Sequence, residues 1–419
     1  MTMTPLALGI DLGTSGVRIA VIDAAGHILH NTATTYRQGL QHPEDWRSSC
    51  RSLIQAIPAN LRSAIQAIAV DGTSGTLLAC DHHGTPIGHA LSYAQSCPEF
   101  AETLMGLLPG GGPASSCSGS LARALRLIQD HGEGLLLRHQ ADWINGWLLN
   151  DWQWGEEGNN LRLGWDLERG QWNEAIATLP WADSLPTVRP SGSDLGRLAA
   201  KPAQELGLCS DVTVVAGTTD SNAAVLAANP GDNDGITVLG STLVLKRFTT
   251  KPLTGPGITS HRVAGRWLCG GASNSGGAVL LQQFPGINLD QLSRQINPEQ
   301  SSGLELRPLP APGERFPSDD PTLEPVLTPR PVSDCLYLHA LLEGMARIEA
   351  EGWERLTELG AQPPKRVITL GGGARNPQWR RLRERILHCP VLTCLTPPAA
   401  GVARLALNHL QGKGLTARP

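Results

Sequence analysis

The first residues that could do chemistry lie in Asp11-Leu12-Gly13-Thr14-Ser15-Gly16-Val17-Arg18, near the start of the sequence. Apolar runs at 6–10 and 17–22 flank this segment, which predicts a β-hairpin whose turn carries two glycines and two hydroxyls. Main-chain amides in such a turn can approach an anion, because the glycines place no Cβ in the way. The Asp11 carboxylate can hold the Mg²⁺ that accompanies a phosphate. The alternative is a plain hairpin with a small polar turn.

A second glycine–hydroxyl turn, Gly240-Ser241-Thr242, lies between apolar runs at 236–239 and 243–248. It follows residues 229–235, where turn formers crowd, and we take that stretch as a domain boundary. Two domains that each present such a turn can hold a polyphosphate from both sides. The P-loop pattern G-x-x-x-x-G-K-[ST] and the protein-kinase signature set are missing from the sequence, so neither of those nucleotide sites is expected.

A third candidate is Asp220, which follows the apolar run 212–216 and Gly217-Thr218-Thr219. A carboxylate within hydrogen-bond reach of an alcohol can take its proton while the alcohol oxygen attacks phosphorus. Asp220 is therefore the candidate general base of a phosphoryl transfer. The alternative is a helix N-cap ahead of Ala223 and Ala224, because Asp is common at that position.

These residues must be positioned by alternating helices and strands, a pattern typical of an α/β fold. Helical periodicity is found at 46–57, in much of 100–150, at 275–284 and 336–359, in a segment ending at 387, and from about 401. Strands are predicted at 65–70, 77–79, 212–216, 267–269, 367–370 and 391–395. The proline-rich residues 300–333 are predicted to lie as a long loop over the surface. Seven of the 11 tryptophans fall between Trp143 and Trp181, which favours packing between helices over a sugar-stacking site.

Composition narrows the classes of function. The 419 residues allow two or three domains with full cores. A net charge of −4 gives no electrostatic reason to expect nucleic acid or a membrane as partner, and no apolar run approaches the ~20 residues of a membrane span. Nine scattered cysteines without a C-x-x-C, and an opening without a leader-like segment, predict a cytoplasmic protein with reduced thiols. The motifs H-E-x-x-H and G-x-S-x-G are missing, which discounts a metalloprotease or serine hydrolase.

Taken in order, five motifs resemble those of the FGGY carbohydrate kinases, a branch of the actin/hexokinase-like ATP-binding fold, over nearly the whole sequence. They are the 11–18 segment, Ala141-Asp142-Trp143-Ile144, Ala216-Gly217-Thr218-Thr219-Asp220-Ser221, Gly240-Ser241-Thr242 and Gly371-Gly372-Gly373-Ala374-Arg375-Asn376. The 11–18 segment is similar to the family's first phosphate motif, and the segment at 141–144 to its sugar-domain helix. The segment at 216–221 is similar to the one that bears the catalytic aspartate. The turn at 240–242 is similar to the second phosphate turn, and the segment at 371–376 to the adenosine motif.

This resemblance implies an α/β fold of two actin/hexokinase-like, ribonuclease H-like ATPase domains with a central cleft. Residues 1–228 would form the N-terminal sugar-binding domain, with the last helix, about 400–419, packed back on it. Residues 229–400 would form the C-terminal ATP-binding domain. ATP and Mg²⁺ are the implied cofactors and a small sugar the implied partner, while both a monomer and a homodimer stay open.

The resemblance also implies roles for individual residues. Asp220 is the catalytic base; Asp11, Ser74 and Asp220 bind the sugar, and Asp11 also holds Mg²⁺. The residues implied to bind ATP are Gly13, Thr14, Ser15, Gly16, Arg18, Gly240, Ser241, Thr242, Gly277, Gly372, Gly373 and Asn376. Plainer alternatives stay open: Arg18 as a surface charge at a strand end, Ser74 as a turn residue, and the glycines as ordinary turns.

The compact length and the run Ile68-Ala69-Val70-Asp71-Gly72-Thr73-Ser74-Gly75-Thr76 resemble the short cyanobacterial and plant sugar kinases, first described as xylulose kinases. That resemblance implies D-ribulose as the better substrate, converted with ATP to D-ribulose 5-phosphate and ADP. D-xylulose or a pentitol is the alternative. A function of another class, an actin-like ATP-binding sugar sensor or scaffold with weak ATPase activity, is the rival. The presence of both Asp220 and Ser74 favours the kinase.

Overall fold

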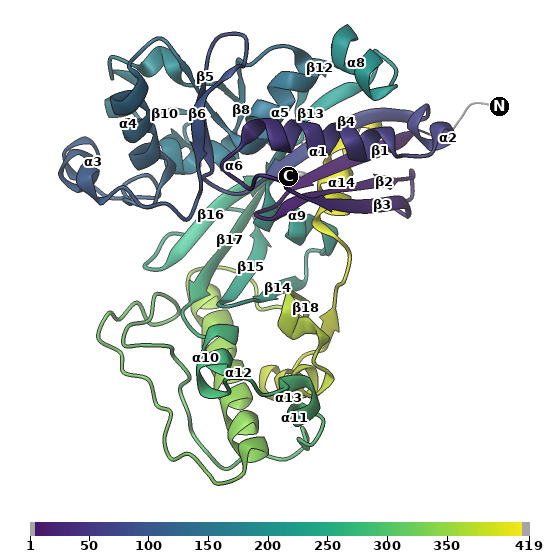
Figure 1. The fold of residues 1–419 in the computed structure, drawn as a ribbon. Coiled ribbons are helices and arrows are strands. Elements are labelled where there is room, and N and C mark those ends of the chain that lie inside the picture. The colour runs from purple at the N-terminus through teal and green to yellow at the C-terminus, as the bar shows by residue number, and fades with distance from the viewer. Residues whose placement is uncertain (1–4, 413–419) are drawn as a thin grey trace. The chain divides into compact units, whose positions relative to one another are not determined.

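The computed structural model describes residues 5–412, which divide into two compact units (Figure 1). Unit 1 contains the described residues up to Ala227, the segment Arg262–Gly265 and the residues from Thr396 onward. Unit 2 contains Ala228–His261 and Arg266–Leu395. Each unit is built on a mixed six-stranded sheet with helices, so the α/β class predicted from the sequence is confirmed.

Unit 1 is organised around a sheet with the strand order β12-β13-β4-β1-β2-β3. Its strands are β1 (Leu6–Leu12), β2 (Gly16–Ile22), β3 (Ile28–Thr35), β4 (Ile65–Gly72), β12 (Asp194–Arg197) and β13 (Thr213–Thr219). β1, β2 and β3 form an antiparallel meander, while β4 runs parallel to β1 and β13 runs parallel to β4. The carboxyl ends of β1, β4 and β13 therefore meet at one edge, where open α/β sheets bind their ligands.

The central strands are buried on both faces, as their continuous apolar runs predict. On one face, large side chains of β1 such as Leu8 and Ile10 pack with α1 (Pro43–Gln55) and α5 (Gln140–Leu149). On the other face, small side chains pack against α14 (Pro398–Leu410) and α9 (Asp220–Ala227).

The small residues on that second face let α14 lie directly on the sheet. A Cβ at Gly9 would lie 1.9 Å from the carbonyl oxygen of Ala399, and one at Gly401 would lie 2.0 Å from the carbonyl oxygen of Ala223. Larger side chains at either glycine would force the helix away. The last helix thus belongs to unit 1; the part of its predicted range at 413–419 lies outside the described residues.

The rest of unit 1 is a second layer around a three-stranded sheet in the order β6-β5-β7. The strands of this sheet are β5 (Leu77–Cys80), β6 (Pro86–Leu91) and β7 (Leu136–His139). The remaining helices of unit 1 are α2 (Ala59–Arg62), α3 (Ala101–Leu107), α4 (Ser120–His131), α6 (Glu157–Asn160), α7 (Glu174–Ala177) and α8 (Ala200–Leu206). Its remaining strands are β8 (Trp154–Glu156), β9 (Trp165–Asp166), β10 (Gln171–Trp172) and β11 (Thr187–Arg189). Two tryptophan pairs of unit 1 pack edge-to-face: Trp143 on α5 with Trp46 on α1, and Trp165 on β9 with Trp172 on β10. The first pair agrees with the predicted packing between helices, whereas the second joins two strands.

Unit 2 repeats the plan of the first sheet, with the strand order β16-β17-β15-β14-β18-β19. Its strands are β14 (Asp234–Leu239), β15 (Leu243–Thr249), β16 (Ile258–Val263), β17 (Arg266–Ser273), β18 (Arg366–Leu370) and β19 (Val391–Thr393), and the last two residues of β16 fall in the segment Arg262–Gly265 that is assigned to unit 1. Its helices are α10 (Gly277–Gln283), α11 (Leu289–Ser293), α12 (Asp334–Glu358) and α13 (Pro377–Leu387). β14, β15 and β17 run antiparallel in turn, and β18 is parallel to β14 and to β19.

The segment 300–333 corrects one prediction. It is free of regular helices and strands, but it does not lie only over the surface, because Leu306, Leu309 and Phe316 are buried. The Phe316 ring packs directly against Gly271, because a Cβ at this glycine would lie 2.4 Å from the ring. Apolar residues spaced irregularly between prolines give no periodic signal, so their burial could not be predicted from the pattern.

Several strands were not predicted, among them β7, which interrupts the helical region 100–150, β12 at the edge of the unit 1 sheet, and β16, which precedes the strand predicted at 267–269. These three are short segments that contain polar residues. Within residues 5–412 no helix is both long and apolar enough to cross a membrane.

Candidate active site

Three aspartates lie at the carboxyl ends of neighbouring parallel strands in unit 1. Asp11 on β1 and Asp71 on β4 are direct register partners, and Thr218 on β13 is the partner of Asp71 on the other side. Asp220 follows β13 and is the first residue of α9. The parallel pairing therefore brings together carboxylates that are far apart in the sequence.

Asp71 differs from the other two aspartates in its burial and its electrostatic surroundings. Asp71 is 0% exposed, and neither of its carboxylate oxygens has a hydrogen-bond partner of good geometry among the described residues. Burial raises the pKa of Asp71 well above its usual range, and the nearby carboxylates of Asp11 and Asp220 raise it further. Burial also raises the pKa of Asp11, but the Arg18 guanidinium opposes that rise. Of Asp11 and Asp71, Asp71 therefore has the more strongly raised pKa.

The first turn has the predicted form. The Gly13 amide donates to the Gly16 carbonyl at 2.9 Å, which closes the hairpin, and Thr14 and Ser15 at its tip are exposed. Arg18 Nη1 lies 3.3 Å from Asp11 Oδ2, so the structure pairs the predicted phosphate contact with the predicted metal ligand. A Cβ at Gly13 would lie 2.7 Å from Arg18 Nη1, so a side chain there would displace the guanidinium from its present position.

Ser74 lies in a turn that is held by its neighbours. The side-chain oxygen of Gln140 accepts hydrogen bonds from the Thr73 amide at 3.0 Å and the Thr73 hydroxyl at 2.8 Å, and that hydroxyl also donates to Thr76 Oγ1 at 2.6 Å. Gly75 adopts a left-handed φ of 94°. The Ser74 hydroxyl itself makes no hydrogen bond to any described residue, so it is the turn hydroxyl that is available to a ligand.

Tyr93 is a candidate that sequence reasoning missed. Its hydroxyl lies 3.1 Å from Thr14 Oγ1 in the phosphate turn, and its amide donates to Thr76 Oγ1 at 3.2 Å. Its side chain is half-exposed, at 41%. An exposed ring between the phosphate turn and the Ser74 turn is suited to contact a bound sugar. Nothing in the sequence near Tyr93 marks it, because the contact joins residues 79 positions apart.

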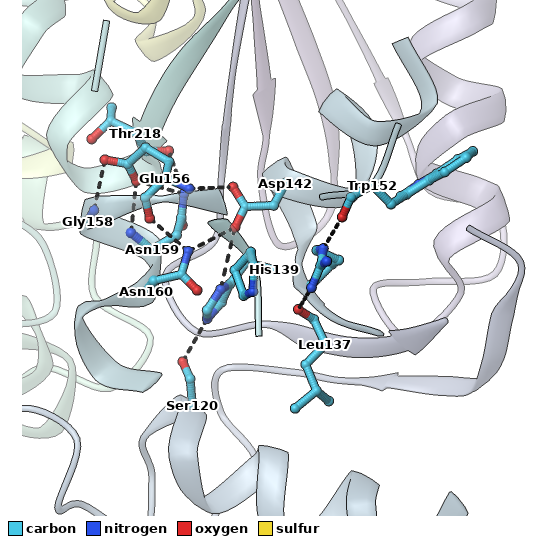
Figure 2. Close-up of polar contacts among 12 residues, drawn as sticks. Ser120, Leu137, His139, Asp142, Trp152, Glu156, Gly158, Asn159, Asn160 and Thr218 are labelled. Carbon is cyan, nitrogen blue, oxygen red and sulfur yellow. Dashed lines mark hydrogen bonds and ion pairs between the residues drawn. The ribbon is translucent and has the colours of Figure 1, made fainter. Parts of the chain in front are cut away.

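A buried polar network supports the end of β13, as Figure 2 shows. The Glu156 carboxylate accepts hydrogen bonds from the amides of Gly158 and Asn159, each at 2.8 Å, and from Asn159 Nδ2 at 3.0 Å. Asn159 Nδ2 also lies 3.4 Å from the carbonyl oxygen of Thr218. Thr218 is two residues before Asp220, so this network fixes the strand end that presents the candidate base.

The network continues into the helix that contains the predicted sugar-domain motif (Figure 2). Asp142 accepts from the Glu156 amide at 3.0 Å and from Asn160 Nδ2 at 3.2 Å. His139 lies between Asp142, at 3.7 Å, and the Ser120 hydroxyl, at 3.0 Å. This serine–histidine–aspartate row is buried throughout, so it supports the fold and offers no accessible nucleophile.

The second turn, in unit 2, packs directly on the start of α10. The amides of Gly277 and Ala278 donate to the carbonyls of Gly240 and Ser241, at 2.9 and 3.1 Å. Gly276 has a left-handed φ of 148°, and a Cβ there would lie 2.7 Å from the Ser241 carbonyl oxygen. The Ser241 side chain stays exposed at the tip.

The predicted adenosine motif lies beside this second turn. Cβ atoms at Gly371 and Gly373 would clash with Leu239, the last residue of β14, whereas one at Gly372 would meet no described atom within 4 Å. Asn376 caps α13, because its side-chain oxygen accepts from the Trp379 amide at 3.0 Å. The motif thus leaves open space at Gly372 and the amide group of Asn376 for a ligand.

The predicted residues therefore form two local sets. The unit 1 set is Asp11, Gly13, Thr14, Ser15, Gly16, Arg18, Ser74 and Asp220, and the unit 2 set is Gly240, Ser241, Thr242, Gly277, Gly372, Gly373 and Asn376. Asp71 was quoted in a motif but given no role. The signal that could have found it is the repeat of an Asp before Gly-Thr-Ser-Gly in both strands, at 11–16 and 71–75.

The unit 1 set fits a magnesium ion that arrives with a nucleotide. Such Mg²⁺ takes only one or two protein carboxylates and keeps water and phosphate oxygens as its other ligands. Asp11 can supply such a carboxylate. In the part of the chain that the structure describes, no group of three or more His, Cys, Asp and Glu side chains is arranged to hold a metal ion.

Comparison with known proteins agrees with this geometry. Residues 236–408 match the C-terminal domain of the FGGY family of carbohydrate kinases. A xylulose kinase of Lactococcus lactis is 23% identical, over 95% of this chain and 87% of that protein. An autoinducer-2 kinase of Yersinia enterocolitica is also 23% identical, over 92% of this chain and 82% of that protein.

Solved structures show the same fold. The crystal structure of a xyloylose kinase from Brucella ovis superposes with a TM-score of 0.82 at 20% identity, covering 97% of this chain and 91% of that chain. The match to the FGGY carbohydrate kinases thus covers residues 236–408, and the alignment with a xylulose kinase at 23% identity extends over 95% of this chain.

Proposed function

We propose that this protein is an ATP-dependent kinase that transfers the γ-phosphoryl group of ATP to a terminal hydroxyl of a ketopentose, with D-ribulose preferred. The observation that carries the proposal is the meeting of Asp11, Asp71 and Asp220 at one sheet edge, beside a turn with two exposed hydroxyl residues. The family match to residues 236–408 and the kinase names of the aligned relatives support the reaction class.

Asp220 is the proposed general base. Its carboxylate takes the proton of the sugar hydroxyl while the hydroxyl oxygen forms a bond to the γ-phosphorus and the bond from that phosphorus to the β,γ-bridging oxygen breaks. ADP leaves with the electron pair of the broken bond. Asp220 is the first residue of α9, and its Oδ1 accepts a hydrogen bond from the Ser221 amide at 2.7 Å, which orients the carboxylate at the end of β13.

Asp11 and the first turn are the proposed phosphate side of unit 1. Mg²⁺, held by Asp11, would neutralise charge on the phosphates. The tip residues Thr14 and Ser15 would donate hydrogen bonds to phosphate oxygens, and Arg18 would balance the buried Asp11 carboxylate until the nucleotide arrives. In unit 2, the turn at Gly240-Ser241-Thr242 and the open space at Gly372 would receive the nucleotide.

The choice of sugar rests on Ser74, whose free hydroxyl is the proposed contact to a sugar hydroxyl. D-ribulose is favoured by the resemblance of the 68–76 run to short sugar kinases. D-xylulose is the second candidate, because the curated relatives aligned over most of the chain include xylulose kinases. The two ketoses differ in the configuration of one hydroxyl, so an assay must separate them.

The test is a coupled assay of ADP release with D-ribulose, D-xylulose and ribitol, each with ATP and Mg²⁺. The proposal expects sugar-dependent turnover, with kcat/KM highest for D-ribulose. A higher kcat/KM for D-xylulose would move the proposal to the second candidate. ATP binding without phosphorylation of any of these substrates would instead support a sugar sensor or scaffold.

A further inference from the structure

Arg123, on α4, is a buried cation that no part of the proposed reaction uses. Its side chain is 0% exposed. Its guanidinium donates to four main-chain carbonyls: Nε to Gln95 at 3.1 Å, Nη1 to Gly75 at 2.9 Å, and Nη2 to Ser118 at 2.8 Å and to Tyr93. One side chain therefore ties three separate loops to the start of α4.

The guanidinium is held without a carboxylate. No Asp or Glu within residues 5–412 forms an ion pair with Arg123, so main-chain carbonyl dipoles alone satisfy the charge. Burial lowers the pKa of Arg123 to about 10, which still leaves it charged at neutral pH. Burying an unpaired charge is costly, and a planar fork with fixed donor directions is the side chain that can satisfy several carbonyls at once.

The anchored carbonyls belong to segments that carry proposed substrate contacts. Gly75 follows Ser74 directly, and a Cβ there would lie 3.1 Å from Arg123 Nη1. Tyr93 reaches back to the phosphate turn through Thr14. The other half of the Ser74 turn is held separately by Gln140, so Arg123 fixes only the side that follows Ser74.

We propose that Arg123 is a positioning residue that sets Ser74 and the Tyr93 loop in register with each other, and so governs affinity and selectivity for the sugar. This inference rests on the proposed kinase function. Its action is on sugar binding, and the nucleotide residues of unit 2 are not among its partners. Lysine keeps the charge but offers no planar fork, so it cannot reach the three loops together.

The experiment compares Arg123→Lys with Arg126→Lys, which changes an arginine on the same helix that pairs with Glu99 at the surface. For Arg123→Lys, the KM of the sugar should rise about tenfold or more and the ratio of kcat/KM for D-ribulose and D-xylulose should shift, because charged hydrogen bonds are lost. The KM of ATP should stay within about twofold. Arg126→Lys should match the wild type in all three quantities.

Unchanged sugar KM and selectivity in a folded Arg123→Lys protein would overturn the inference. An equal loss for sugar and ATP would also overturn it, because that pattern indicates a general structural defect. Wild-type protein that phosphorylates no sugar would instead sink the proposed function, which keeps the two failures distinct.

A measurement on the wild type covers the case in which Arg123→Lys does not fold. Hydrogen exchange of the amides at 74–76, 93–97 and 118–120 should slow together when the preferred sugar is added. Protection of the Ser74 turn without the 93–97 loop would contradict a shared anchor.

Discussion

The two sheets share one plan, but the matching positions carry different chemistry. In unit 1 the hairpin β1–β2 places Asp11 opposite Arg18, and the parallel neighbour of Asp11 is Asp71. At the matching places of unit 2, one pair before the turn, Val238 lies opposite Val244 and its parallel neighbour is Leu370. Three charged or acidic groups in one sheet thus correspond to three apolar side chains in the other.

This difference supports our proposal that the catalytic acids lie in unit 1 and that unit 2 binds the nucleotide through its backbone. Unit 2 keeps the backbone features of the turn, including Gly276 and Gly371, whose positive φ and close neighbours exclude a side chain, but it has no acids at the matching positions. A nucleotide can be bound by main-chain amides and open space alone, whereas proton transfer and metal binding need carboxylates. On this proposal, variants of the unit 1 acids should affect turnover, and variants of the unit 2 turn should affect nucleotide binding.

The largest effect is expected for the base. Asp220→Ala should lower kcat by about 10³-fold, within the range known for removal of a general base, while the ATP affinity stays near that of the wild type. The control is Asp211→Asn, because Asp211 is an exposed aspartate that lies just before the start of β13, whereas Asp220 follows its end. Steady-state kinetics and nucleotide titration check both. Near-normal turnover of Asp220→Ala would remove this residue from the role.

The two paired acids of unit 1 should respond unequally. Asp11→Asn should lower kcat about 10²-fold and raise the Mg²⁺ concentration needed for half-maximal rate, because the ionised ligand is lost. Asp71→Asn should cost less than about tenfold, since the raised pKa of Asp71 favours its neutral form, which asparagine mimics. Magnesium titrations of the two variants provide the comparison. Equal losses would contradict the assignment of separate roles.

In unit 2, the open space at Gly372 gives a way to test nucleotide binding without disturbing the fold. Gly372→Ala should leave the melting temperature unchanged, since no described atom lies within 4 Å of the added Cβ, yet raise the KM of ATP about tenfold. Gly110→Ala, also in open space but in unit 1, is the matched control. An unchanged KM for ATP in Gly372→Ala would place the nucleotide elsewhere.

The smallest expected effect concerns acid stability of unit 2. Burial alone would raise the pKa of Glu343, but hydrogen bonds from His339, Ser302 and Arg385 outweigh it and lower the pKa to about 2. A carboxyl with a lowered pKa contributes stability that is fully present above its ordinary pKa and is lost as the pH falls towards the lowered one. The free energy of unfolding, measured with denaturant, should therefore fall as the pH is lowered from about 4.5 to 2. Glu343→Gln should make that free energy depend less on pH in this range. An unaltered pH slope in Glu343→Gln would show that other groups control it.

The sequence predicted the hairpins, the α/β class and most helices, because apolar periodicity and glycine-rich turns are local signals. Register was not visible to that reasoning, and it is register that makes Asp71 a neighbour of Asp11. Contacts such as Thr14 with Tyr93, or Arg123 with Gly75, join residues far apart in the sequence and carry no pattern of their own. The burial of Phe316 within the proline-rich segment was not predicted either, because its contacts also carry no local pattern in the sequence.

The most direct test of the central claim follows phosphorus itself. ³¹P NMR of wild type and Asp220→Ala, each with ATP, Mg²⁺ and D-ribulose, distinguishes a sugar phosphate from inorganic phosphate. We predict a sugar phosphate ester and ADP with the wild type, and intact ATP with Asp220→Ala over the same period. Inorganic phosphate without an ester from the wild type, or the same ester formed at the same rate by Asp220→Ala, would contradict the account.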